Sequence, residues 1–141
     1  MNYHFRIHDN KDGLWAECLE LSGCVTEGRT QSQLARNMKI ALNLYLDEPE
    51  KSTVIFPPPL SLPARHGVVS IEVEPAVAFS MQLRQLRIGS HLTQKEAASR
   101  LGMKNLFSYQ RLERRANPSL ATLKKVKTLF PQLSMDSILG S

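Results

Sequence analysis

The chain has 141 residues and a formal net charge of +5, a length that suits one ordinary domain or two small ones. No segment approaches the roughly 20 consecutive apolar residues that a membrane-spanning helix requires, and the opening residues MNYHFRIHDNKDG lack the basic start and apolar core of a signal peptide. We therefore expect a cytoplasmic protein that has no membrane partner.

Positive charge is concentrated in the second half of the chain. Residues 1–67 contain 7 Lys and Arg and 8 Asp and Glu, a net charge of −1, whereas residues 68–141 contain 11 and 5, a net charge of +6. A basic half attracts phosphate groups and makes their binding sensitive to salt, although a basic patch alone is equally compatible with a solvated surface.

The first part of the chain has the pattern of an antiparallel sheet. Apolar and polar residues alternate over residues 3–7, as in a half-buried strand, and residues 9–13 supply turn residues. Residues 14–21 then supply a second strand, which completes a hairpin. A short third strand is expected over residues 25–28.

A helix is expected after these strands. Thr30 can cap its start, and the region around Pro49 ends it. Its apolar residues recur at three- and four-residue spacing, so that it can cover one face of the sheet and give an α+β fold. This face consists of Leu34, Met38, Leu42 and Tyr45.

Two aromatic residues of the sheet, Tyr3 and Trp15, are candidates for contact with a protein partner. Amphipathic aromatic side chains often anchor interfaces. In a small sheet the same side chains more often complete the core, which is the interpretation that we favour.

The two cysteines, Cys18 and Cys24, are separated by five residues, and no second cysteine pair is present. A zinc site would need further ligands from His4, His8 or a second chain. A reducing compartment disfavours a disulfide. We therefore expect two reduced thiols, no metal site and no cofactor.

Acidic residues of the first half could in principle hold divalent cations for phosphodiester cleavage, which needs clustered carboxylates. They lie largely at predicted turns, exposed strand positions and a helix end, so we interpret them as a solvated surface that could also complement a basic partner. No Ser/His/Asp or Cys/His arrangement stands out, and we expect no enzymatic activity. The acids are Asp9, Asp12, Glu17, Glu20, Glu27, Asp47, Glu48 and Glu50.

The middle of the chain is rich in proline. Residues 56–63 should be extended, because proline fixes its own φ and keeps its predecessor out of helical conformations. Residues 68–73 alternate as a further strand, which we assign to the N-terminal sheet, and Pro75 can begin a helix toward Ile88. The domain boundary is therefore expected near Glu74. The two expected domains are residues 1–74 and 75–141.

Two short helices joined by a tight turn are predicted in the second half. Thr93 can N-cap the first of them, with Glu96 as its capping-box partner. Small apolar residues follow, which allow another helix to cross closely. Gly102 can adopt the positive φ that ends the helix in a turn, and the next helix begins at Asn105 or Leu106. The small apolar face consists of Ala97, Ala98 and Leu101.

The second of these helices has two different faces. Leu106, Tyr109 and Leu112, with Glu113 as a further candidate, recur at three- or four-residue spacing and are expected to face inward. The other face is rich in Arg and Gln, which can make bidentate contacts to guanine and adenine and can also bind phosphates. This composition predicts a helix that enters the major groove of DNA. The outer face consists of Phe107, Ser108, Gln110, Arg111 and Arg114.

Residues 92–131 resemble the Cro/C1-type (XRE) helix-turn-helix family, and the resemblance implies an all-α domain that binds double-stranded operator DNA. Pro118 would take the first position of the fourth helix. The spacing from Gly102 to Glu113 is one residue longer than the commonest family pattern, which leaves the base-reading positions open. The matching residues are Leu92-Thr93-Gln94, Ala97-Ala98, Leu101-Gly102, Leu112-Glu113 and Asn117-Pro118-Ser119-Leu120.

Two polar residues of this segment have predicted roles. By the resemblance, Gln94 is a candidate phosphate contact at the start of the helix that Thr93 caps, which is the second helix of the family's domain, with local capping as the alternative. Glu113 is expected to be structural and bonded to the backbone or to a neighbouring arginine, because DNA would repel an acid on its own side. The full set of DNA-binding candidates is Gln94, Lys95, Lys104, Asn105, Phe107, Ser108, Gln110, Arg111, Arg114 and Arg115.

Residues 3–46 resemble the N-terminal domain of the HicB antitoxin family, some of whose members carry a C-terminal helix-turn-helix. The resemblance implies a curtailed ribonuclease-H-like fold for this domain. It also implies a type II toxin–antitoxin system, in which the chain neutralises a HicA-type mRNA-cleaving toxin and represses the operon encoding both. The matching features are Tyr3 in its strand, Asp12-Gly13-Leu14-Trp15-Ala16, Leu21-Ser22-Gly23-Cys24-Val25-Thr26-Glu27-Gly28, and the helix from Thr30 through Ala41 and Leu42.

Two other functions stay open, namely a stand-alone transcriptional repressor whose N-terminal domain senses a ligand or a protein, and, less favoured, a ribonuclease-H-like nuclease. One recognition helix reads only a few base pairs, so specificity generally needs two copies about 34 Å apart, and we predict a homodimer or higher homo-oligomer. Apolar residues near the C-terminus could form that interface or, as we favour, complete the helical core. They are Leu129, Phe130, Leu133, Met135, Ile138 and Leu139.

Overall fold

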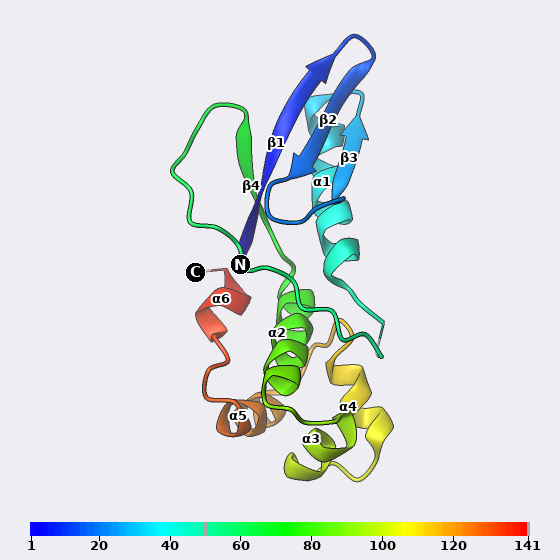
Figure 1. The fold of residues 1–141 in the computed structure, drawn as a ribbon, viewed down its shortest axis with the longest axis vertical. Coiled ribbons are helices and arrows are strands. Elements are labelled where there is room, and N and C mark those ends of the chain that lie inside the picture. The colour runs from blue at the N-terminus through cyan, green and yellow to red at the C-terminus, as the bar shows by residue number, and fades with distance from the viewer. Residues whose placement is uncertain (50, 141) are drawn as a thin grey trace. The chain divides into compact units, whose positions relative to one another are not determined.

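The computed structural model describes residues 1–49 and 51–140, which form one antiparallel sheet and several helices (Figure 1). Glu50 and Ser141 therefore lie outside the described residues. The chain divides into two compact units, of which the first contains residues 1–46 and 56–73 and the second contains residues 47–55 and 74–139. In the part of the chain that is described, no helix is long and apolar enough to cross a membrane.

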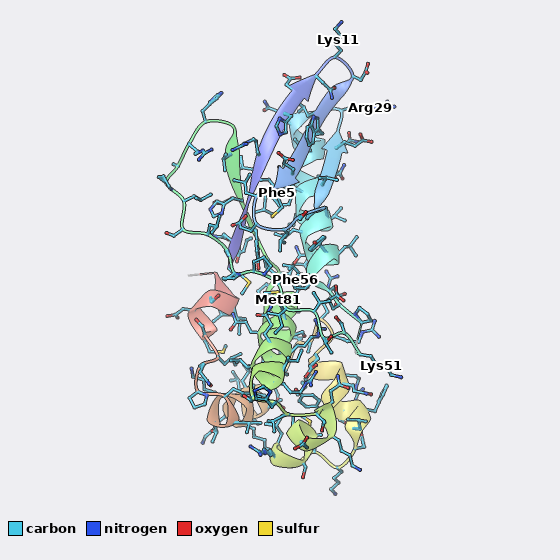
Figure 2. All side chains as sticks on the ribbon, in the orientation of Figure 1. Phe5, Lys11, Arg29, Lys51, Phe56 and Met81 are labelled. Carbon is cyan, nitrogen blue, oxygen red and sulfur yellow. The ribbon has the colours of Figure 1, made fainter. Side chains whose placement is uncertain are left out.

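The sheet of the first unit has four antiparallel strands in the order β3-β2-β1-β4. The hairpin, the short third strand and the assignment of the later strand to this sheet are all confirmed. Lys11 lies at the tip of the β1–β2 turn (Figure 2). The strands are β1 (Asn2–Asn10), β2 (Gly13–Cys18), β3 (Val25–Gly28) and β4 (Val68–Glu72).

The second strand is shorter than predicted, because β2 ends at Cys18 and does not continue to Leu21. The chain turns here. The Cys18 N–H donates to the Cys24 carbonyl at 2.9 Å, and the Cys24 N–H donates to the Leu21 carbonyl at 3.1 Å. The second of these bonds closes a turn over residues 21–24, so the chain leaves the strand here although residues 19–21 keep an apolar pattern.

One helix, α1 (Gln31–Leu46), covers the sheet face that carries Tyr3 and Phe5 (Figure 1). The predicted cap is confirmed, since the Thr30 hydroxyl accepts a hydrogen bond from the Gln33 N–H at 3.1 Å. The apolar face is confirmed as well. Leu34, Met38 and Leu42 are buried, while Tyr45 is half-buried and donates its hydroxyl to the Ser22 carbonyl at 2.6 Å.

The close approach of α1 to β3 depends on Gly28. A Cβ atom at this position would lie 2.7 Å from the backbone nitrogen of Leu34, and backbone atoms of a helix cannot move aside cheaply. We predict that Gly28→Ala lowers the free energy of unfolding by about 1–3 kcal/mol, measured by urea denaturation with Trp15 fluorescence. The matched control is Gly89→Ala at the end of a helix, where an added Cβ meets nothing within 4 Å, and no loss is expected. Equal midpoints for Gly28→Ala and the unchanged chain would contradict this explanation.

The opposite sheet face carries Trp15. This residue pairs with His8 across β1 and β2, and the two rings stack with centroids 4.0 Å apart. Trp15 is only half-buried, so the expectation that it completes the core is wrong. Side chains of a strand alternate between faces, and its position in β2 sends it away from α1.

The proline-rich segment adopts neither helix nor strand over residues 52–65. It is nevertheless anchored to the first unit at two points. Phe56 is buried, with its ring 5.6 Å from that of Tyr45, and the Tyr3 hydroxyl donates to the Pro57 carbonyl at 2.8 Å. The proline-rich residues from Phe56 onward therefore pack on the first unit and are more than a spacer.

The second unit is helical and is built around α2 (Pro75–Gly89), which begins at Pro75 as predicted. The small helices pack their apolar residues into one core with this helix. Among the C-terminal residues, Phe130, Leu133 and Ile138 are buried, which confirms core completion for these three, whereas Leu139 is 61% exposed. The other helices are α3 (Gln94–Arg100), α4 (Leu106–Leu112), α5 (Leu120–Leu129) and α6 (Met135–Leu139).

Candidate functional site

The start of α3 is fixed by its own sequence. The Thr93 side chain accepts a hydrogen bond from the Glu96 N–H at 3.0 Å, and the Glu96 carboxylate accepts one from the Thr93 N–H at 3.2 Å, so the predicted capping box is present. Glu96 has a lowered pKa because these bonds stabilise its charged form. The predicted apolar face is confirmed too, since Ala97, Ala98 and Leu101 are all buried.

The turn between α3 and α4 uses Gly102, whose φ of +70° lies in the region that side chains disfavour. α4 then begins at Leu106, and the Asn105 side chain caps it by accepting from the Ser108 N–H at 2.8 Å. The side chain of Asn105, a DNA-binding candidate, is therefore already engaged in capping α4. The inward face holds Tyr109 and Leu112, but not Leu106, which is 40% exposed. Leu106 occupies the first turn, beyond the edge of the buried core.

The fourth predicted helix also starts later than expected. Pro118 is not its first residue, because Ser119 is the N-cap and Leu120 is the first residue of α5. The Ser119 hydroxyl accepts a hydrogen bond from the Thr122 N–H at 3.1 Å, which is the stronger start signal. Pro118 instead lies in the connection after α4.

Glu113 is the centre of a buried polar cluster behind α4. Its carboxylate is fully buried and accepts hydrogen bonds from Arg87 Nε at 2.6 Å and Nη2 at 3.1 Å, and also from the Tyr109 hydroxyl. Arg84 Nε lies 3.9 Å from the same carboxylate, and its Nη2 donates to the Glu113 carbonyl at 2.7 Å. The structural role predicted for Glu113 is confirmed. Its arginine partners come from α2, not from its own neighbourhood in the sequence.

Burial and charge act together on the titratable groups of this cluster. Burial raises the pKa of Tyr109, and the adjacent Glu113 charge raises it further, so the phenol stays a donor. Burial alone would lower the pKa of Arg87, but its hydrogen bonds to Glu113 raise it. For Arg84 burial dominates and lowers the pKa. Two buried cations therefore share one carboxylate.

A chain of hydrogen bonds runs from this buried cluster to the surface of α3 and α4. Gln94 Nε2 donates to Glu113 Oε1 at 3.3 Å, and Gln110 Nε2 donates to Gln94 Oε1 at 3.2 Å. Both glutamines are half-buried. These two bonds of Gln94 join α3 to α4 and its C-terminal cap. They are not the local capping bonds that were considered as the alternative to phosphate contact.

The exposed part of this surface is basic and includes one aromatic ring. Residues 93–119 contain six Lys and Arg and two acids, and one of the acids is the buried Glu113. Phe107 is 63% exposed, and the guanidinium carbon of Arg111 lies 5.0 Å from the centre of its ring. This contact limits the freedom of Arg111 before any ligand binds. The other exposed cations are Lys95, Arg100, Lys104, Arg114 and Arg115.

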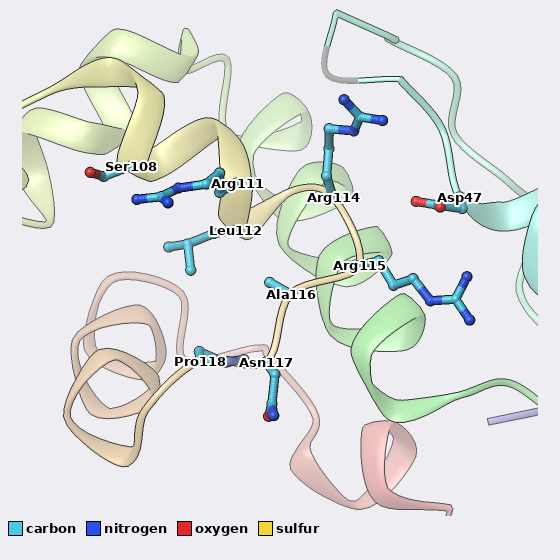
Figure 3. Close-up of a pocket in the computed structure, with 9 residues that line it drawn as sticks. All are labelled: Asp47, Ser108, Arg111, Leu112, Arg114, Arg115, Ala116, Asn117 and Pro118. Atoms are coloured by element: carbon cyan, nitrogen blue, oxygen red, sulfur yellow. The ribbon is translucent and has the colours of Figure 1, made fainter.

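An open hollow of about 590 Å³ lies along the end of α4 and the segment that follows it. Figure 3 shows Ser108 and Arg111 on α4, with Arg114 and Arg115 pointing in different directions after it. Arg115 pairs with Glu74 and has a positive φ of 46°. Ser108, Gln110 and Arg111 therefore all lie on α4, whereas the ion pair with Glu74 holds Arg115 away from them.

The candidate residues of the first unit are separated by the sheet. Tyr3 is fully buried beneath α1, which confirms its place in the core, and Trp15 lies on the uncovered face. The acids form no metal-binding group of three or more among the described residues. Glu20 differs from the expected exposed acids, because its side chain is only 1% exposed and lies 2.7 Å from His4 Nδ1.

Sequence reasoning missed Arg84 and Arg87, which orient Glu113. Arginine in a helix usually marks an exposed face, and nothing local distinguishes these two from surface cations. One signal was available, since they are three residues apart in a helix that carries buried apolar residues at Leu83 and Phe79. No protein-family model and no curated protein matches this sequence.

Proposed function

We propose that this chain is a HicB-type antitoxin of a type II toxin–antitoxin system, with a C-terminal Cro/C1-type helix-turn-helix that binds operator DNA. The second unit would repress the operon, and the first would bind and neutralise a HicA-type mRNA-cleaving toxin. In this proposal the chain is a binding protein and not an enzyme.

The observation that carries the DNA-binding part is the hydrogen-bonded path from Arg87 through Glu113 and Gln94 to Gln110. A buried ion pair orients two surface amides, and an exposed arginine lies one residue further along α4. Amide and guanidinium groups are the side chains that read adenine and guanine edges. Groups held in place before binding lose less entropy on contact with DNA, which favours their use for recognition.

The size of α4 supports binding by more than one copy. It has seven residues, or about 10 Å at 1.5 Å per residue, and therefore spans about three base pairs at 3.4 Å each. So short a contact gives little specificity. We accordingly propose that a homodimer or higher homo-oligomer places two copies of α4 about one helical turn apart on the duplex.

The toxin-binding part is supported by the resemblance of residues 3–46 and by the sheet face that α1 leaves uncovered. That face offers Trp15 stacked on His8, which is the kind of half-buried aromatic group that interfaces use. Tyr3 is proposed only as a core residue, since it is fully buried.

A stand-alone repressor with a sensing domain is the second candidate. An open hollow of about 540 Å³ beside α1 favours it, because such a volume suits a small ligand. The hollow is lined largely by apolar side chains, with Asp9 and His66 among the polar ones. The apolar lining includes Ile7, Leu14, Met38, Val69 and Ile71.

The deciding experiment is to express the small open reading frame next to the gene, alone and together with this chain. We expect growth arrest and loss of mRNA from the neighbour alone, and recovery when both are present. The two proteins should also co-purify. A harmless neighbour that does not bind would remove the antitoxin proposal and leave the repressor as the leading one.

A further inference from the structure

Cys18 and Cys24 face each other at the point where β2 and β3 diverge. The register of these strands pairs Glu17 with Val25, and its continuation places Cys18 opposite Cys24. The Cys18 N–H donates to the Cys24 carbonyl at 2.9 Å, which shows that this continuation is real. Cys18 also pairs with Phe5 of β1, whose side chain lies on the face that α1 covers. Paired residues share a face, so the two cysteines lie on that face as well.

The spacing of the two residues suits a covalent bond. Directly opposed residues of a hydrogen-bonded antiparallel pair have Cα atoms about 5.5 Å apart, within the roughly 4.4–6.8 Å range of protein disulfides. Both side chains project from the same face of the sheet, because directly opposed residues of neighbouring strands share a face. Both thiols are free in this structure.

Several groups around the Cys18 sulfur shift the pKa of its thiol. The Cys24 side chain and the backbone N–H groups of Glu20 and Leu21 lower the pKa of Cys18, whereas burial and the nearby Glu20 carboxylate raise it, and the lowering effects dominate. The hydrogen bond to Cys18 and burial both raise the pKa of Cys24. Cys18 is 7% exposed and Cys24 is 3% exposed, so Cys18 is the less deeply buried residue of the two.

We propose that Cys18 and Cys24 are a redox modification site, at which a peroxide converts the two thiols into a reversible intrachain disulfide. The Cys18 thiolate attacks one peroxide oxygen and breaks the O–O bond, which leaves a sulfenic acid on Cys18 and releases hydroxide that takes up a proton as water. Cys24 loses its proton and attacks the Cys18 sulfur. The S–S bond forms, the S–O bond breaks, and hydroxide leaves with that proton as a second water.

The disulfide would act on a turn that holds several other groups. Glu20 lies 3.7 Å from Cys18 Sγ and accepts hydrogen bonds from the His4 N–H at 2.9 Å and the Leu60 N–H at 3.0 Å. Oxidation removes the S–H group that Cys18 donates to Glu20. Because Glu20 also binds the Leu60 N–H, oxidation of the cysteine pair would affect the contact that holds the proline-rich segment.

The test treats the purified full chain with hydrogen peroxide, in buffer and in urea, and follows intact mass and alkylation by N-ethylmaleimide after denaturation. In buffer the chain should lose the mass of two hydrogen atoms and both alkylation sites, and dithiothreitol should restore both. The tryptic peptide of residues 12–29 contains both cysteines and should carry the bond. Cys18→Ser and Cys24→Ser should each lose this product.

A second test compares the equilibrium constant for disulfide formation in the folded and unfolded chain. In glutathione buffers the equilibrium constant for disulfide formation should be at least about tenfold higher in the folded chain than in urea, because folding raises the effective concentration of the two thiols. An equal or lower constant in the folded chain would overturn the proposal. So would sulfinic acid or an interchain dimer as the main peroxide product of the folded chain.

Discussion

Replacing Glu113 by Gln is expected to lower the free energy of unfolding of the second unit by about 3–5 kcal/mol. The change keeps the size of the side chain and removes its charge, so that Arg87 and Arg84 become buried cations that have lost the carboxylate they share. The cost of an uncompensated buried charge is much larger than that of a lost surface ion pair. Because a whole domain is stable by only about 5–15 kcal/mol, the variant should melt far below the unchanged chain.

The measurement is urea denaturation followed by far-UV circular dichroism for the helices and by Trp15 fluorescence for the first unit. The matched control is Glu27→Gln on β3, an exposed carboxylate, which should change stability by less than about 0.5 kcal/mol. A helical transition in Glu113→Gln that coincides with the control would show that the buried cluster contributes little. It would also remove the basis for an oriented Gln94.

The turn and caps around α3 were predictable because each depends on residues close together in the chain. The capping box joins residues three apart, and Gly102 supplies its own positive φ. The partners of Glu113 were not predictable in this way. Arg84 and Arg87 lie 29 and 26 residues before it, and only the packing of α2 against α4 brings them together.

The first unit shows the same contrast between local and distant information. Alternation predicted the strands and the membership of β4 in the sheet. The end of β2 was placed too late, because backbone bonds within the turn compete with the ladder and leave no trace in an apolar pattern. The opposition of Cys18 and Cys24 follows from the register, so sequence reasoning needed the true length of that turn to find it.

Within the proposed function, replacing both Gln110 and Arg111 by Ala is expected to weaken specific operator binding by roughly thirtyfold or more. Each side chain that reads a base edge contributes about 1–3 kcal/mol, and two such losses of at least 1 kcal/mol give this factor. Folding should be unaffected, because Arg111 is exposed and the Gln110 side chain is half-buried and bonded to another half-buried side chain, that of Gln94. Neutralisation of the toxin should persist, since both changes lie in the second unit.

The binding assay is a gel shift at fixed salt, with duplex DNA from upstream of the gene and an excess of random-sequence competitor. The control is Gln31→Ala with Arg36→Ala on α1, which removes the same residue types and the same charge from exposed positions of the first unit. Net charge affects binding to any sequence, whereas base contacts affect only the specific complex. The control should therefore lose little specific affinity. If both double variants weaken specific and random binding equally, α4 acts through charge alone and does not read the operator.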